Sequence, residues 1–477
     1  MTKSSAKANS KQITFDFNLE KPVTADFSAG DVVSDGGILL FKAADDRLGL
    51  TKRIAACIED KRDPDRVVHT MHSLVAQEIF SRACGYEDTN DADRTRNNSA
   101  FKVGGGKLPS EAPLASFSTQ SRLENSVTAD DLMRIQNELP KLFLKRSKRP
   151  PKHVELYMDT THDPVYGTQQ LSFYNGFYKE YCYTDLFLFC AGFPLGAVVR
   201  AGNAAPAEGS ISMLHRVTTS LRAARRTMRI EFAADSAFGG PEMYDYCEKN
   251  RITYFIGIAP NHALECNVKP FVEAAYEKYV ALYGKPEPLH GREWRQKQER
   301  IRYSSKDEGR IQELFEADRR VRVYGEFVYQ ARTWETPKRV IARVDYTDEG
   351  PDVRFVVTNY VGGKPGWVYE KKYCARANCE NNIKELKALR CDKLSCQEYL
   401  PNQFRLLSFV CAYILTLETR RALPSSARNI SVQTLLLRFI KIGAQIRETS
   451  RAVRFCLSGV YPWQNEFFQC ARNLGAA

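Results

Sequence analysis

The sequence predicts an α/β fold, because strand-like and helix-like segments alternate through the middle of the chain. Three short β-rich runs, HVELYMD, YCYTDLFLFC and PLGAVVRA, come first, between residues 153 and 201. A helix-like segment from Ser210 to about Arg226, a strand-like run ending at Asp235, a helix near Gly240 and the strand-like YFIGIA follow. Strands and helices in this order are typical of a sheet with helices packed on its faces.

The N-terminal part predicts a mainly helical region over residues 15–150, after a polar tail at 1–14 whose composition indicates disorder. Ser118 is predicted to cap a short helix that exposes Ser121 and Arg122 in its first turn. A short helix that begins with polar and basic side chains suits a reader of the DNA major groove, although many ordinary surface helices look the same.

A basic linker follows this region, at residues 145–152. Its two adjacent prolines, Pro150 and Pro151, favour an extended backbone and indicate a domain boundary. Its cations are suited either to follow a DNA backbone or to remain a solvated hinge; they are Lys145, Arg146, Lys148 and Arg149.

The predicted core is interrupted by a charged, β-rich insertion and is followed by a helical C-terminal region. In that last region Arg447, Arg451 and Arg454 stand at i, i+4 and i+7, which predicts a basic helix face that contacts DNA, a second protomer or only solvent. The predicted organisation is a tail at 1–14, a helical DNA-binding region at 15–150, core segments at 151–260 and 351–424, the insertion at 261–350 and the helical region at 425–477.

Composition indicates a folded, basic protein of the cytoplasm. The net charge is +12 and 43% of the 477 residues are hydrophobic, which fits a folding nucleic-acid binder or a merely basic enzyme. The 13 scattered cysteines predict reduced thiols rather than disulfides. The apolar stretch at 186–199 is too short to span a bilayer, so no membrane is expected as a partner. The cluster of Cys374, Cys379, Cys391 and Cys396 has no CxxC pair, and ordinary thiols are favoured over a zinc site.

Three acidic residues provide the strongest chemical signal. Asp159 and Asp235 each end a strand-like run, and Glu380 lies on a later helix-like segment. At about 100° per residue, Glu380 shares one helix stripe with Tyr373, Arg376 and Lys387. Such a stripe suits a surface that holds a metal ion and grips phosphates. Either aspartate alone is more simply explained as a turn or helix cap, but the three together favour a divalent-metal site for phosphoryl transfer. Asp163, followed by Pro164, is predicted to lie in a turn.

The tract YCARANCENNIKELK reads Tyr-x2-Arg-x3-Glu-x6-Lys. This spacing resembles the signature of a large clade of bacterial insertion-sequence transposases, the DDE type with a ribonuclease-H-like catalytic core. The order of the predicted strands and helices is similar to that core. Further segments, SDGGILLFKAADDRLGL, GYEDTNDADRTRNN and IKIGAQIRETSRAVRF, extend the resemblance over nearly the whole chain.

The resemblance implies a cut-and-paste transposase. Asp159, Asp235 and Glu380 would hold two Mg²⁺ ions, with Mn²⁺ as a substitute, and Tyr373, Arg376 and Lys387 would contact DNA phosphates. The partners would be double-stranded DNA, as terminal inverted repeats and target, and a second copy of the chain on paired ends; when bound to DNA the protein would be nucleoid-associated. In relatives an aromatic residue of the insertion stacks on a displaced base, which makes Trp294 and Trp334 candidates, although Trp334 also suits a core position. The alternatives are a stand-alone metal nuclease and an inactive DNA-binding regulator.

Overall fold

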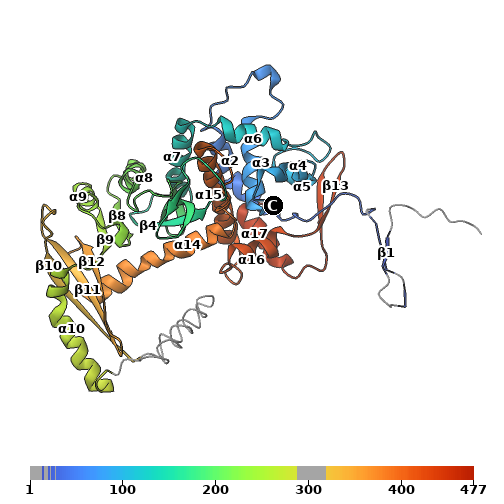
Figure 1. Ribbon diagram of the computed structural model, residues 1–477. Coiled ribbons are helices and arrows are strands. Elements are labelled where there is room, and N and C mark those ends of the chain that lie inside the picture. The colour runs from blue at the N-terminus through green and yellow to red at the C-terminus, as the bar shows by residue number, and fades with distance from the viewer. Residues whose placement is uncertain (1–12, 16–19, 22, 27, 287–318, 477) are drawn as a thin grey trace, which may run out of the picture. The chain divides into compact units, whose positions relative to one another are not determined.

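The structure is a computed structural model, which describes residues 13–15, 20, 21, 23–26, 28–286 and 319–476. The described chain forms two compact units (Figure 1). Unit 1 combines the N-terminal part up to residue 135 with residues 385–394 and 400–477, and unit 2 contains residues 136–384 and 395–399.

Unit 2 is built on one mixed sheet. Its order is β10-β11-β12-β9-β8-β4-β6-β5, with β7 also paired to β6. The β4–β8 and β8–β9 pairs are parallel, whereas β4–β6, β6–β7 and β9–β12 are antiparallel. The strands are β4 (His153–Pro164), β5 (Phe173–Asn175), β6 (Glu180–Cys190), β7 (Phe193–Val198), β8 (Arg229–Ala234), β9 (Thr253–Ile258), β10 (Arg320–Tyr329), β11 (Lys338–Thr347) and β12 (Gly350–Thr358).

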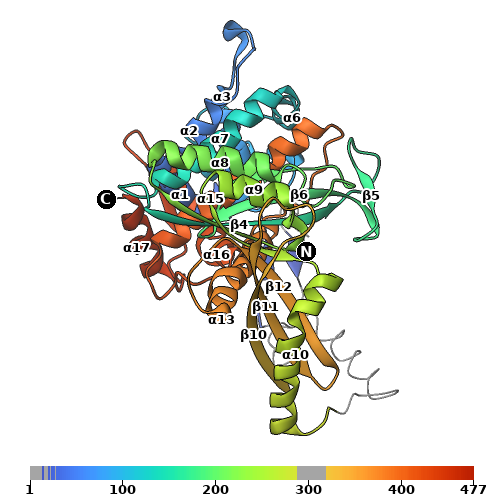
Figure 2. The ribbon, with the colours of Figure 1, turned by 90° about the vertical axis from the view of Figure 1, so that its left-hand side faces the viewer.

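Helices cover both faces of this sheet (Figures 1 and 2). On one face lie α8 (Ser210–Ala224) and α9 (Pro241–Lys249), and on the other lies a continuous helical segment that begins at Pro365. That segment consists of α13 (Pro365–Trp367), the π-helix η4 (Val368–Tyr373), the 3-10 helix η5 (Cys374–Arg376) and α14 (Ala377–Lys387). The remaining helical elements that the structure describes here are η3 (Ser236–Phe238) and α10 (His262–Tyr283).

The seven strands and helices predicted between residues 153 and 259 occur in the predicted order, and the structure adds the short β5 and η3. The apolar stretch at 186–199 forms the β6–β7 hairpin, whose turn is made by Ala191 and Gly192 with φ of 48° and 78°. Two positive φ values suit a two-residue hairpin turn, because its twist then matches that of the strands. The turn predicted at Asp163 is wrong: Asp163 is buried within β4, which continues to Pro164 in its pairing with β6.

The predicted insertion differs from a purely β-rich element. It begins with α10, a helix of 22 residues, and its strands extend the main sheet, because β12 pairs with β9. The main sheet therefore continues beyond β9 through β12 and β11 to β10. Trp294 and the basic run at 292–303 lie outside the described residues.

Unit 1 is mainly helical, as predicted, with a long apolar helix in its core. That helix, α15 (Tyr399–Ala422), is long and apolar enough to cross a membrane, but 89% of its most apolar window is buried within the structure, as in the core helix of a globular protein. Other helices are α1 (Ile38–Leu48), α2 (Leu50–Ala55), η1 (Pro64–Arg66), α3 (Met71–Ala83), η2 (Thr89–Asp91), α4 (Ala92–Thr95), α5 (Ser99–Gly104), α6 (Phe117–Ser126), α7 (Ala129–Lys145, which continues into unit 2), α16 (Val432–Leu435), the π-helix η6 (Leu436–Ile440) and α17 (Gln464–Leu474).

Small strands join the two ends of the chain in unit 1. β3 (Val32–Val33) pairs with β13 (Ala444–Glu448), which also pairs with β14 (Val453–Leu457), while β1 (Ile13–Phe15) pairs with β2 (Val23–Ala25). Beside β3, buried Asp35 accepts a hydrogen bond from Lys441 Nζ at 2.6 Å and one from Tyr86 at 2.9 Å. The segments SDGG and KIG, distant in sequence, therefore pack together.

The predicted helix face of arginines in this region is wrong. Arg447 lies in β13 and Arg454 in β14, where the two residues are directly paired, and Arg451 lies in the turn between the strands. A spacing of seven residues also places two side chains opposite each other across a tight hairpin. The arginines remain neighbours, but on a β-hairpin.

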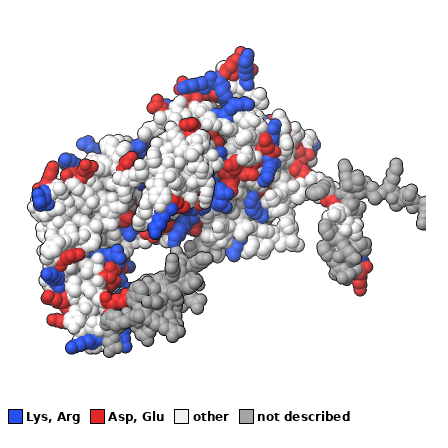
Figure 3. All heavy atoms as spheres, viewed as in Figure 1, with Lys and Arg blue, Asp and Glu red and all other residues white. Residues whose placement is uncertain are grey.

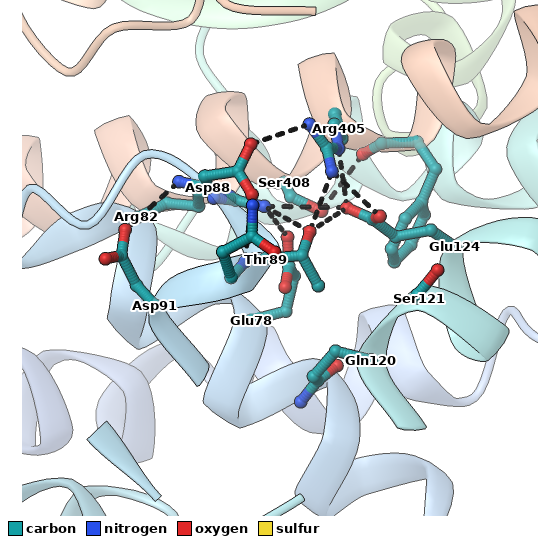
Figure 4. Close-up of polar contacts among 12 residues, drawn as sticks. Glu78, Arg82, Asp88, Thr89, Asp91, Gln120, Ser121, Glu124, Arg405 and Ser408 are labelled. Atoms are coloured by element: carbon teal, nitrogen blue, oxygen red, sulfur yellow. Dashed lines mark hydrogen bonds and ion pairs between the residues drawn. The ribbon is translucent and has the colours of Figure 1, made fainter. Parts of the chain in front are cut away.

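A buried polar network fixes α6 to α3 and α15 (Figure 4). Arg405 of α15 donates to Glu124 of α6 at 2.7 and 3.1 Å and to Thr89 at 2.8 Å. Arg82 of α3 donates to Glu78 at 2.5 Å and lies 3.5 Å from Glu124. These five side chains are all buried, so their charges are compensated inside the unit rather than by water.

Candidate active site

Asp159 and Asp235 lie side by side on neighbouring parallel strands. Met158 of β4 pairs with Ala234 of β8, and the two aspartates are the next residues along each strand. Asp235 follows the end of β8, as predicted, but Asp159 does not end its strand, because β4 continues beside β6. The parallel β4–β8 pairing stops at residue 158, so Asp159 lies where β8 leaves the sheet.

The residues of the Tyr-x2-Arg-x3-Glu-x6-Lys motif do not lie on one regular helix. Tyr373 ends the π-helix η4, Arg376 ends the 3-10 helix η5, and Glu380 and Lys387 belong to α14. The assumption of about 100° per residue is therefore wrong for the first part of the motif, because π and 3-10 turns contain different numbers of residues. Single π turns inside helices are frequent at functional sites.

Tyr373, Arg376 and Glu380 are nevertheless in contact. The Arg376 guanidinium lies 5.2 Å from the centre of the Tyr373 ring, and its Nη1 lies 3.3 Å from Glu380 Oε1. The Glu380 side chain is 53% exposed, so it remains open to a ligand. The next residue back, Cys379, is buried and its Sγ lies 3.7 Å from the carbonyl oxygen of Tyr157. α14 is thus packed on β4 two residues before Asp159.

Asp235 and Glu380 are close enough to affect the ionisation of Asp159. The pKa of Asp159 is raised to about 6, chiefly by burial and also by the negative charges of Asp235 and Glu380, against the lowering effects of the Thr160 N–H and of Arg376. Asp159 also accepts a hydrogen bond from the Thr160 N–H at 2.8 Å, and Asp235 one from the Ala237 N–H at 2.9 Å. Carboxylates that repel one another in a partly open site suit a divalent cation, since its charge removes the repulsion.

A second polar cluster, which sequence reasoning missed, holds the motif against the sheet. Lys372 Nζ donates to Glu155 at 2.9 Å and to Glu231 at 2.8 Å, and His153 Nε2 lies 3.1 Å from Glu231. Although burial opposes it, the hydrogen bonds that Lys372 donates to Glu231 and Glu155 raise the pKa of Lys372. Lys372 therefore ties η4 to β4 and β8, immediately before Tyr373. In the sequence, Lys372 precedes the motif tyrosine and Glu155 lies four residues before Asp159 on the same face of β4. These positions mark both residues as near the site but do not identify them as partners.

This cluster is also the one place in the described chain where three potential metal ligands, His153, Glu155 and Glu231, have atoms within 4.8 Å of one another. A metal ion there would have to displace the Lys372 ammonium group, which already neutralises both carboxylates. Asp159, Asp235 and Glu380 are more widely spaced than this, and Arg376 is their neighbouring cation. The acid triad is therefore the better candidate for a catalytic metal.

Two glycine positions fix the turn that follows Asp235. A Cβ on Gly257 of β9 would lie 2.8 Å from the backbone nitrogen of Ser236 and 2.8 Å from the Tyr373 hydroxyl. A Cβ on Gly239 would lie 2.6 Å from the Gly257 carbonyl oxygen. Tyr373 therefore lies directly beside the turn that carries Asp235.

We expect Gly257→Ala to slow DNA cleavage by about 10-fold or more while the protein stays folded, because a displacement near 1 Å at a catalytic group can cost up to about 10²-fold. Cleavage rate and circular dichroism would be measured together. Gly443→Ala is the matched control, since a Cβ there meets open space. Equal cleavage by both variants would contradict the close fit inferred at Gly257.

The predicted DNA-binding residues of α6 lie beside a basic cavity of about 460 Å³ in unit 1. The helix begins at Phe117 after Ser116, so Ser118 lies inside it and is not its cap. Arg122 is exposed and lines the cavity, whereas Ser121 is half-buried and lies toward the network of Figure 4. The cavity is lined by five cations and two carboxylates; the cations are Lys61, Arg62, Arg66, Arg96 and Arg122.

The other predicted DNA contacts have different environments. In the linker Lys148 and Arg149 are exposed, while the Arg146 guanidinium lies 4.9 Å from the centre of the Phe193 ring. Trp334 is only 6% exposed and packs edge-on against Tyr244 and Tyr329, at ring distances of 5.3 and 5.2 Å. Its burial favours the core interpretation over base stacking. All 13 cysteines are free thiols.

An α/β unit with a carboxylate, Asp159, that is affected by two neighbouring carboxylates, beside an arginine and a tyrosine, suits metal-assisted phosphoryl transfer. The family model of the transposase DDE domain, group 1, matches residues 15–477, so the chain belongs to this family of DDE transposases. Members of this class cleave and transfer DNA strands, and they typically require a divalent metal. No curated protein matches the chain.

Proposed function

We propose that the protein is the transposase of a bacterial insertion sequence, which binds terminal inverted repeats, cuts the DNA ends and joins the 3′ ends to a target. The convergence of Asp159, Asp235 and Glu380 carries this proposal. The order of β6, β4, β8 and β9, with one antiparallel and two parallel pairings, supports a ribonuclease-H-like core. The proposed place of action is the cytoplasm, on the nucleoid.

The donor set fits divalent metal ions such as Mg²⁺, because all three candidate ligands are hard carboxylate oxygens and their mutual repulsion calls for a cation. When bound, two such ions would activate a water or a 3′-hydroxyl and stabilise the leaving oxygen. Asp159 and Asp235 would hold them from the sheet and Glu380 from α14. Arg376 and Tyr373, already in contact beside Glu380, would orient a neighbouring phosphate.

The decisive experiment uses the DNA that flanks the gene on both sides. The protein is incubated with this DNA, a target plasmid and Mg²⁺, and the broken and joined ends are sequenced. Cuts at both element ends followed by joined products support the transposase. Cuts without joining favour a stand-alone nuclease, and binding without cuts favours an inactive regulator.

We expect Lys387→Ala to weaken binding about equally for cognate and scrambled DNA, because a lysine that contacts phosphate carries no base information. The slope of log affinity against log salt should fall by about one unit, and cleavage should slow. Binding to both DNAs at two salt concentrations checks this. A loss confined to cognate DNA would show that Lys387 reads bases, and an unchanged slope would assign it a role in α14 alone.

We also expect Arg122→Ala to lower the salt slope by about one unit, because no ion pair of Arg122 occurs in the described part of the chain and its cavity is basic. Glu124, two residues along α6, is held by Arg405, so the helix is a rigid platform. The control is Arg472→Ala, which removes one positive charge from another exposed position in unit 1. Equal effects of the two variants would mean that only net charge matters.

A further inference from the structure

An arm of unit 2 exposes an unusual number of aromatic side chains. This aromatic arm, residues 164–181, joins β4 to β6 and contains β5 at the end of the sheet (Figure 2). Five of the ten exposed aromatic side chains in the described chain lie on it, together with Leu171. They are Tyr166, Phe173, Tyr174, Phe177 and Tyr181. Monomeric proteins seldom expose large apolar side chains in such a concentration, which marks an interaction surface.

Hydrogen bonds within the arm fix its backbone, so that these side chains are held in defined positions. The Asn175 side-chain oxygen accepts hydrogen bonds from the N–H groups of Phe177 and Tyr178 at 3.0 and 3.3 Å. The Lys179 N–H donates to the Asn175 carbonyl at 2.8 Å, which closes the turn, and the Phe177 side chain at its tip is 85% exposed. The base of the arm is fixed where the Tyr183 hydroxyl donates to the Gln170 carbonyl at 2.8 Å.

Exposed aromatic side chains suit either DNA or another protein as a partner. The charge of the surrounding residues decides between the two. DNA carries a phosphate charge at every step, and its binding sites supply several cations. The aromatic arm contains one lysine and one glutamate, Lys179 and Glu180, so its net charge is zero. Protein interfaces, by contrast, are enriched in tyrosine and phenylalanine and depleted of charge in their centres.

A second copy of this chain is a partner that such an uncharged surface suits. Two copies, each with a net charge of +12, repel one another as whole molecules. On the face shown in Figure 3, lysine and arginine are interspersed with acidic residues over the described parts. A neutral aromatic surface can meet itself about a two-fold axis without that repulsion. We propose that the aromatic arm is the surface through which two copies of this chain associate.

This inference rests on the proposed function insofar as a transposase must process two element ends together. The arm continues from β4, and Pro164 lies five residues beyond Asp159 on the same strand. Association through the arms would therefore join two copies close to their candidate active sites. The binding energy should be concentrated in the most exposed side chains, Tyr166 and Phe177.

The test compares the full-length protein with the double variant Tyr166→Ser/Phe177→Ser by sedimentation velocity, without DNA. Both side chains are at least 85% exposed, so their replacement should leave the fold intact. We expect the wild type to sediment as a dimer of the 54.2 kDa chain and the variant to dissociate at least about 10-fold more readily. Val361→Ser, a 95% exposed residue of the same unit, is the matched control and should remain dimeric.

Changing the salt concentration and adding DNA test the alternatives to this proposal. Association through an uncharged surface should persist from about 0.1 to 0.5 M salt, because screening does not weaken it. A wild type that stays monomeric at about 50 µM, or a double variant that stays dimeric, would overturn the proposal. So would a variant that loses affinity for a random 30-base-pair duplex while its mass is unchanged, since the arm would then bind DNA. Sedimentation without DNA does not depend on cleavage, so a dimer that fails to cut DNA would refute only the proposed function.

Discussion

Asp159→Asn is expected to abolish DNA cleavage, with a loss of at least about 10³-fold, while binding to the element's ends stays nearly unchanged. The substitution removes the carboxylate whose ionisation Asp235 and Glu380 both affect at the candidate metal site. Loss of a group that merely supports a metal ligand already costs about 10–100-fold, so loss of a ligand should cost more. Groove and phosphate contacts lie elsewhere and should continue to hold the DNA.

Cleavage rates and DNA affinity would be measured on the same preparation. Glu273→Gln is the matched control, because it removes one exposed carboxylate of the same unit from α10 without touching the acids. If Asp159→Asn cuts DNA at the wild-type rate, Asp159 is not a metal ligand.

Because the pKa of Asp159 is raised, the stability of the protein should depend on pH in a way that can be measured without an activity assay. Because its folded-state pKa is raised to about 6 from 3.8, its contribution to stability is fully present below pH 3.8 and is lost as pH rises through about 6. At pH 8 without metal, the ionised group should cost the wild type about 2–3 kcal/mol, which Asp159→Asn removes. Thermal unfolding in EDTA should therefore show the variant to be more stable than wild type at pH 8 but not at pH 4. Mg²⁺ should reverse the order at pH 8.

The sequence predicted the central strands because they depend on local patterns. Runs rich in aromatic and β-branched residues, separated by turns such as Ala191-Gly192, define the strands. Aspartates beside adjacent parallel strands come together once those strands pair, which places Asp159 beside Asp235, whereas their role as metal ligands stays a prediction.

The errors arose where local spacing fits more than one backbone. The spacing of Arg447 and Arg454 suits a helix face and equally a tight hairpin, and only pairing with β3 decides between them. The π and 3-10 turns between Val368 and Arg376 produce no periodic pattern of residues in the sequence from which they could be predicted. Lys372 finds its partners Glu231 and Glu155 at sequence separations of 141 and 217 residues, which no local pattern can reveal.

Arg405→Met is expected to destabilise unit 1 by about 3–5 kcal/mol, since removal of one partner leaves a buried charge uncompensated. Arg405 supplies two hydrogen bonds to Glu124 and one to Thr89. Without it, the Glu124 carboxylate would keep the Thr89 hydroxyl at 2.9 Å and Arg82 at 3.5 Å. Because Glu124 fixes α6 to α15, DNA binding should fail at a lower temperature than in the wild type.

Thermal and urea unfolding of Arg405→Met, Glu124→Gln and the double variant would measure the coupling. We expect the double variant to be more stable than the sum of the single losses predicts, because it removes the uncompensated charge together with its partner. Arg472→Met, at an exposed position of α17 in the same unit, should cost less than about 1 kcal/mol. Equal losses for Arg405→Met and Arg472→Met would show that the buried charge of Arg405 adds nothing to the stability of unit 1. A loss confined to Arg405→Met would mean that the buried charges of unit 1 hold α6, and with it Arg122, in place.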